Sequence, residues 1–135
     1  MKRINVVHFL CMLAAVSVLN GCAVSIKTTP VSLSPPKSET APRQIRIEQA
    51  ATVTLDTAYE RKIPADSIWR YTGTIAQGDV FRPVKTIFTI EGRQVHEAYL
   101  VLSGTRLVGF YLPGESNYSA LSTPVILAIG NVKNE

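Results

Sequence analysis

The stretch that decides the fold runs from Lys85 to Pro113 and reads KTIFTIEGRQVHEAYLVLSGTRLVGFYLP. Three extended runs are separated by the segments EGR and SGT, each of which contains a glycine. Gly92 and Gly104 can supply the positive φ angles that tight turns between strands require. The pattern therefore predicts an antiparallel β-meander with strands at 85–91, 94–102 and 106–112.

The middle run of the meander is apolar on both faces from Ala98 to Leu102, which indicates a central strand covered on both sides. The flanking sequence contains β-branched residues and alternates in polarity, as strands do. Further strands are expected at 45–55, 67–75, 80–84 and 124–131. Pro83 cannot donate to a sheet ladder, so the 80–84 strand is expected to be an edge or to be broken there.

No segment has strong helical periodicity, although 57–66 could hold a short helical turn before Pro64. Residues 115–122 are expected to form a loop. The predicted fold class is all-β or nearly so. We expect a small antiparallel β-sandwich or a partly open barrel that contains the meander and spans residues 44–135.

The segment from Cys22 to residue 43 has a different composition. Serine and threonine are frequent, no apolar periodicity is present, and four prolines interrupt any helix, namely Pro30, Pro35, Pro36 and Pro42. We expect a disordered tether that holds the domain clear of a membrane or lets it reach a partner.

The amino-terminal segment has the layout of an export signal. Lys2 and Arg3 precede an apolar run at 6–19, which ends in Leu19, Asn20, Gly21 and Cys22. This ending resembles the lipobox of bacterial lipoproteins. The resemblance implies that signal peptidase II recognises Leu19 and Gly21 and removes residues 1–21. It also implies diacylglycerol on the Cys22 sulfur and an acyl chain on the new amino terminus.

The lipobox resemblance also implies a location. Ala23 follows the cysteine, and in the family's enteric pattern a residue other than aspartate there directs the protein to the outer membrane. We therefore expect a cell-envelope protein anchored in the outer membrane and facing the periplasm. Cys11 would leave with the leader, so the mature chain would hold no free thiol. An ordinary secretory signal with an unrelated cysteine is the alternative interpretation.

The charge of the chain offers little for nucleic-acid binding. The formal net charge is +4 at pH 7, and loss of Lys2 and Arg3 with the leader would lower it by two. The remaining basic residues are scattered along the sequence rather than gathered in one run. No nucleic-acid partner is expected.

The sequence offers few groups for catalysis. His96 and Glu97 are adjacent, but neighbouring strand residues point to opposite faces, so the two side chains should not converge. HExxH, GxSxG and phosphate-binding loop motifs are absent from the sequence. We therefore predict a protein that is not an enzyme, without catalytic or metal-binding residues and without a cofactor besides the lipid on Cys22.

Three residues near the end of the meander are candidates for partner binding: Tyr111, Glu115 and Tyr118. Aromatic side chains are frequent among the residues that dominate binding energy at interfaces. Tyr118 is expected to be exposed in the loop that follows Pro113. Tyr111, opposite in direction to Phe110 along its strand, is expected to face outward or lie under a second layer.

These features predict a lipid-anchored envelope lipoprotein, acting as a binding or structural accessory subunit of an envelope assembly with an unidentified protein partner. One alternative is an inhibitor or binder of a soluble enzyme or ligand, which would use the 113–119 loop. A small hydrolase is a second alternative.

Overall fold

The structure is a computed structural model and describes residues 24–37 and 43–133. Strands make up most of this part of the chain. No helix occurs within these ranges. The strands are β1 (Thr29–Pro30), β2 (Gln44–Ile47), β3 (Ala51–Thr54), β4 (Glu60–Ile63), β5 (Ile68–Ile75), β6 (Gly78–Pro83), β7 (Thr89–Glu91), β8 (Val95–Glu97), β9 (Tyr99–Ser103), β10 (Arg106–Leu112), β11 (Asn117–Ile126) and β12 (Ile129–Asn131).

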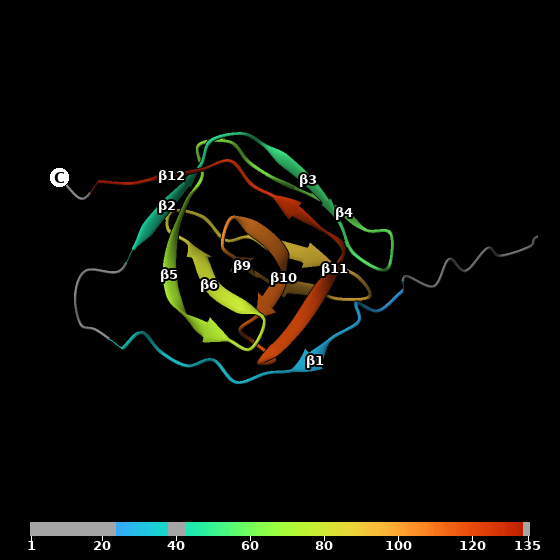
Figure 1. Cartoon of the computed structure of the whole chain (residues 1–135). Helices are drawn as coiled ribbons and strands as arrows, with labels where there is room; N and C mark the ends of the chain where they lie inside the picture. Colours follow the sequence, from blue (N-terminus) through green and yellow to red (C-terminus); the bar gives the residue numbers. More distant parts are fainter. Residues whose placement is uncertain (1–23, 38–42, 134–135) are drawn as a thin grey trace, which may run out of the picture.

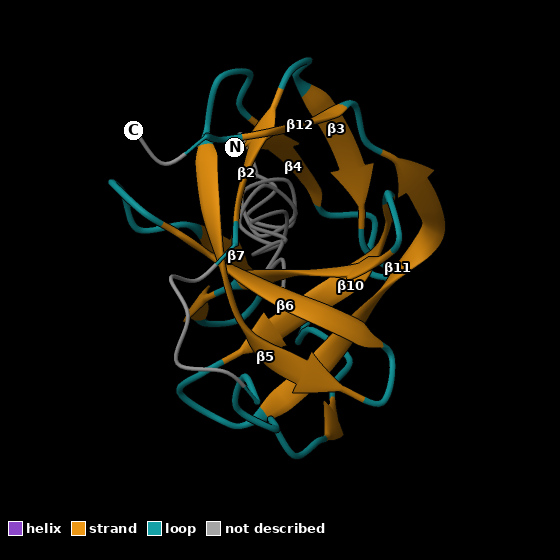
Figure 2. Cartoon of the chain, turned by 60° about the vertical axis from the view of Figure 1, so that its left-hand side comes forward, coloured by secondary structure: helices purple, strands orange, loops and turns teal. Residues whose placement is uncertain are grey.

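The main sheet has eight strands in the order β1-β11-β10-β9-β6-β5-β2-β12, and every pair is antiparallel. It curls around its own core, while β3–β4 and β7–β8 form two separate hairpins (Figures 1 and 2). Its edge strands, β1 and β12, do not pair with each other, so the sheet is an incompletely closed barrel. The predicted all-β antiparallel class is confirmed.

The predicted meander of strands at 85–91, 94–102 and 106–112 is present only in part. The 106–112 strand, β10, has the expected bounds and pairs with β9, but the first strand is reduced to β7 in a separate hairpin. The other neighbour of β10 is β11. The predicted strand at 94–102 is divided at Ala98. Its first part, β8, pairs with β7, whereas β9 lies between β6 and β10. Leu100, Val101 and Leu102 of β9 are all buried, which confirms a central strand covered on both faces.

Several local expectations were wrong. The strand expected at 45–55 is divided into β2 and β3, which belong to different sheets, and the one at 124–131 is divided between the end of β11 and β12. β6 is an interior strand between β5 and β9, with Pro83 as its last residue. The segment proposed for a helical turn holds β4, which pairs with β3, so sheet pairing outweighs the helix-forming residues there. The segment proposed as a loop is largely the first half of β11, whose residue Tyr118 pairs with Tyr111 of β10. The turn between β10 and β11 is therefore shorter than expected.

The main core fills the inner, concave side of the curled sheet. The Trp69 and Phe88 rings meet edge to face with centroids 5.3 Å apart, and the centroid of the Phe110 ring is 5.8 Å from that of Phe88. Leu100 and Leu112 are fully buried in the same cluster. Burial of each large apolar side chain stabilises the fold by about 1.5–3 kcal/mol, so this cluster is the main source of stability.

A second apolar cluster lies on the opposite face of the same strands: Ile75, Val80, Val101, Tyr111 and Tyr118. Residues 24–37, here called the strap, run beneath the sheet from β11 towards β5 (Figure 1). Val31 and Leu33 of the strap pack on this cluster. Residues 24–37 were predicted to be part of a disordered tether, but in the structure they pack on the sheet and form part of the module.

Backbone hydrogen bonds tie the strap to the main sheet at Val31 and Ser34. The Val31 amide donates to the Ser116 carbonyl at 3.0 Å. Ser34 and Thr74 exchange two bonds, of 2.8 and 2.9 Å. Main-chain bonds of this kind do not require a particular side-chain pattern, so the strap was not recognisable from apolar periodicity.

Gly73 is the point at which the strap lies closest to β5. Its φ is +148°, and a Cβ there would meet the Ser34 carbonyl oxygen and approach the Leu33 side chain to 2.9 Å. Gly73→Ala should therefore lower the free energy of unfolding by about 1–3 kcal/mol, as measured by urea denaturation with Trp69 fluorescence.

The matched control is Gly114→Ala, because a Cβ at Gly114 would meet nothing within 4 Å. We expect this substitution to change the free energy of unfolding by less than about 0.5 kcal/mol. Equal effects of the two substitutions would show that the strap does not press on β5.

Candidate functional site

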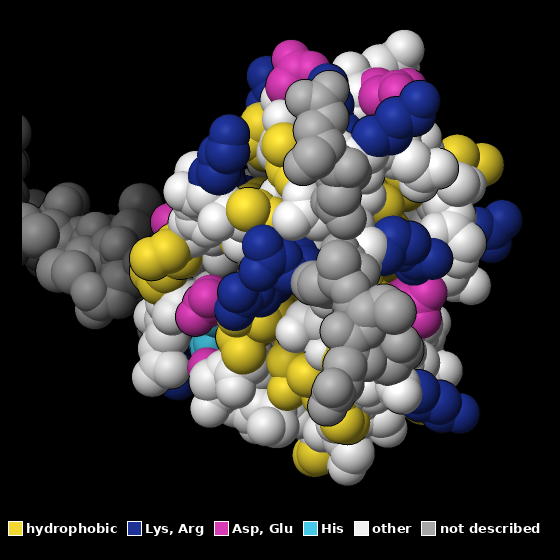
Figure 3. Space-filling model, turned by 90° about the vertical axis from the view of Figure 1, so that its left-hand side faces the viewer, with side chains coloured by type: hydrophobic (Ala, Val, Ile, Leu, Met, Phe, Trp, Pro, Cys, Tyr) yellow, Lys and Arg dark blue, Asp and Glu magenta, His cyan; other side chains and the backbone are white. Residues whose placement is uncertain are grey.

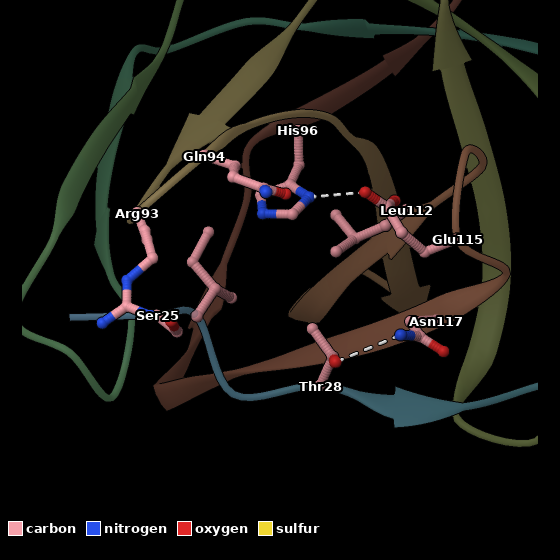
Figure 4. Close-up of a pocket in the computed structure, with 9 residues that line it drawn as sticks. Ser25, Thr28, Arg93, Gln94, His96, Leu112, Glu115 and Asn117 are labelled. Carbon is pink, nitrogen blue, oxygen red and sulfur yellow. Dashed lines mark hydrogen bonds and ion pairs between the residues drawn. The ribbon is translucent and has the colours of Figure 1, made fainter. Parts of the chain in front are cut away.

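A polar pocket of about 310 Å³ opens where the strap passes the β7–β8 hairpin and the β10–β11 turn (Figure 4). Three separate parts of the chain supply its walls. The lining residues are Ser25, Ile26 and Thr28 from the strap, Arg93, Gln94 and His96 from the hairpin, and Leu112, Glu115 and Asn117 from the turn and its flanking strands.

The central pair of the pocket is His96 and Glu115. The His96 Nδ1 atom lies 2.7 Å from the Glu115 carboxylate, and their side chains are 15% and 40% exposed. His96 is held on β8 opposite Ile90. Glu115 belongs to the turn after β10, where the next residue, Ser116, adopts a φ of 54° that orients the chain into β11. The pair joins the hairpin to the turn.

The structure agrees with the expectation that His96 and Glu97 do not converge. Glu97 lies beside the Tyr99 hydroxyl instead. The partner of His96 is 19 residues further along the chain, so no local pattern could have identified it.

The strap supplies a second polar pair. Asn117 Nδ2 donates a hydrogen bond to the Thr28 hydroxyl at 3.1 Å, which ties β11 to the strap at the pocket wall. Sequence analysis missed Ser25 and Thr28 because they lie in the segment assigned to a tether. It missed Asn117 because the role of that residue depends on Thr28, which is 89 residues away in the sequence.

The side chains of the pocket are suited to binding a small polar group. Arg93 and the Gln94 amide can donate hydrogen bonds, Glu115 can accept them, and Leu112 forms an apolar base. Within the described ranges, neither Ser25 nor Thr28 hydrogen-bonds to His96, so the His96–Glu115 pair does not activate either hydroxyl in this arrangement.

Of the three predicted partner-binding residues, only Glu115 lines the pocket. Tyr111 and Tyr118 are 5% and 9% exposed and belong to the second apolar cluster. The expectation of an exposed Tyr118 was wrong, because β11 turns its ring over Gly109 and its hydroxyl donates to the Val108 carbonyl at 2.9 Å. The predicted lipid-attachment residue Cys22 and the recognition residues Leu19 and Gly21 lie outside the described residues.

Basic side chains do not form one continuous surface on the face viewed in Figure 3. Lys and Arg lie there in several groups, with Asp and Glu beside some of them. Arg70 and Arg82 are directly opposite each other on β5 and β6. Two like charges in that position destabilise a sheet slightly.

Burial raises the pKa of the Tyr118 phenol above its ordinary value of 10.0, and burial together with Glu97 does the same for Tyr99. The unfolded chain therefore loses these protons first as the pH rises. The free energy of unfolding should fall as the pH increases above about 10.

Tyr118→Phe should make this alkaline decline shallower, while costing about 1 kcal/mol at neutral pH through the lost hydrogen bond to Val108. Urea denaturation at a series of pH values measures both effects. An unchanged alkaline slope in the variant would contradict the assignment to Tyr118.

Comparison with protein-family models, with curated proteins and with solved structures gave no match. In the described ranges, no helix has the length and apolarity to cross a membrane, and no group of three or more His, Cys, Asp or Glu side chains could hold a metal ion.

Proposed function

We propose that this chain is a lipid-anchored protein of the bacterial envelope, in which the β module serves as a binding or structural accessory subunit of an envelope assembly. The lipobox-like sequence ending at Cys22 supports the anchor. Ala23 supports the outer membrane, facing the periplasm, as the location. The protein partner is unidentified.

One structural observation carries this proposal furthest. The strap lies against the module from Val24, only two residues after the proposed lipid attachment site. An anchor connected so closely to a stable module transmits force and position rather than providing long reach. That arrangement suits a protein that holds a partner at the membrane.

The arrangement of the pocket is consistent with binding. Its main polar groups are paired with one another, His96 with Glu115 and Asn117 with Thr28, which favours a fixed surface for recognition. Two or three acyl chains on one cysteine would make membrane attachment effectively permanent, since each buried methylene contributes about 0.8 kcal/mol.

Cys22→Ser should move the protein from the membrane fraction to the soluble fraction of the periplasm, because the thiol that accepts the lipid is lost. Globomycin, which inhibits signal peptidase II, should make the uncut precursor of the unaltered chain accumulate. Fractionation and intact-mass spectrometry measure these changes. Normal maturation under globomycin would contradict the lipoprotein proposal.

A second candidate function is the capture of a soluble enzyme or small ligand in the pocket, which the position of Glu115 favours. Glu115→Ala should then reduce cross-linking to the partner in cells at least several-fold. Glu97→Ala is the matched control, since Glu97 is an exposed carboxylate that does not line the pocket. Equal cross-linking by both variants would argue against this function.

A further inference from the structure

We infer that one end of the module, formed by the start of the strap and the tip of the β7–β8 hairpin, rests against the phospholipid headgroups of the membrane that anchors it. This end is called the proximal face and consists of Val24, Ser25, Gly92, Arg93 and Val95. The inference rests on the proposed lipid anchor at Cys22 and adds a defined orientation to it.

The connection between the proposed lipid attachment site, Cys22, and the first residue of the strap, Val24, is short. Consecutive Cα atoms are about 3.8 Å apart, so the Cα of Val24 can lie no more than about 8 Å from that of Cys22. The headgroup layer on each side of the hydrocarbon core is roughly 5–8 Å thick. A lipidated Cys22 therefore places Val24 within or directly beside the headgroups, whatever conformation Ala23 adopts.

The strap also restricts rotation of the module about the proposed anchor. The Val24 carbonyl and the Ile26 side chain lie over Gly92, where an added Cβ would be 3.0 Å from the carbonyl oxygen and 2.7 Å from the side chain. Ile26 also packs against the main core. Residues 24–26 are thus fixed to the hairpin tip, so only Cys22 and Ala23 connect the proposed lipid to the module.

This contact assigns a role to Gly92 that differs from the one predicted. Gly92 was expected to have a positive φ, but it does not. In the described chain, the glycines with a positive φ are Gly73, Gly78 and Gly104. At Gly92 the missing side chain provides space for the strap.

The side chains of the proximal face suit the interface between water and lipid. Val24 and Val95 are 64% and 65% exposed, and the other large apolar side chains with high exposure in the described chain are Ile87 and Ile126. Arg93 is exposed two residues before Val95, and Ser25 lies beside it (Figure 4). Apolar side chains with an arginine suit the glycerol and phosphate region of a bilayer. Glu91, exposed nearby, offsets the charge of Arg93, so attraction to anionic lipid adds little to the anchor.

The opposite end of the molecule would then point away from the membrane. Figure 1 shows the start of the strap on one side of the molecule and β12 on the other. β12 is an edge of the main sheet, paired only with β2. A partner strand added to this edge would meet the module at its distal end.

The test compares two single-cysteine variants of the full, lipidated chain in phosphatidylethanolamine/phosphatidylglycerol vesicles. Arg93→Cys reports on the proximal face, and Asn131→Cys, also exposed, reports on β12. Each is labelled with a fluorophore and exposed to lipids that carry a quencher in the headgroup. We expect quenching at position 93 to be several-fold stronger than at position 131.

A third variant carries a 12-residue Gly-Ser spacer between Ala23 and Val24, which gives a mean reach of about 20 Å. The spacer should abolish the difference between positions 93 and 131 while leaving the protein attached. If the protein is lipidated and bound to the membrane, but quenching is equal at both positions and the spacer has no effect, the proposed orientation alone is overturned. Protein that carries no lipid and does not bind the vesicles would overturn the proposed anchor, and the orientation with it.

Discussion

The structure depends on the coverage of a sheet that is apolar on both faces. The inner face of β5, β6, β9 and β10 encloses the main core, which leaves Val80, Val101 and Tyr111 on the other face. Exposed to water, such a patch would favour aggregation. The strap covers it with Val31 and Leu33, and its backbone is bonded to the Ser116 carbonyl and to Thr74. The strap is therefore part of the fold, although its composition is that of a linker.

The candidate site depends on the same constraint. Once Val31 and the residues after it are bound to the sheet, the preceding residues pass the β7–β8 hairpin and supply one wall of the pocket. Thr28 is bonded to Asn117, and Ile26 packs over Gly92. The pocket and the start of the strap thus lie at the same end of the molecule. We propose that the module works close to the membrane, with its β12 edge available to a partner at the other end.

Sequence patterns predicted the parts of the fold that local chemistry determines. The apolar run in β9 and the turn at Gly104, whose φ is 63°, followed from burial on both faces and from the conformational freedom of glycine. Long-range contacts were not accessible in this way. Tyr118 is buried because its ring fits over Gly109, and His96 meets Glu115 only through the packing of two hairpins. The strap lacked a signal because backbone bonds hold much of it in place.

Hydrogen exchange of individual amides tests the central claim most directly, because it reports on the strap without depending on the lipid. The amides of Val31 and Ser34 donate to the main sheet, and that of Thr74 donates back to the strap. We expect these three amides to exchange only through opening reactions that break the strap's pairing, and therefore much more slowly than in an unstructured peptide. Exchange of the Val31 and Ser34 amides at the rate of an unstructured peptide would contradict the account.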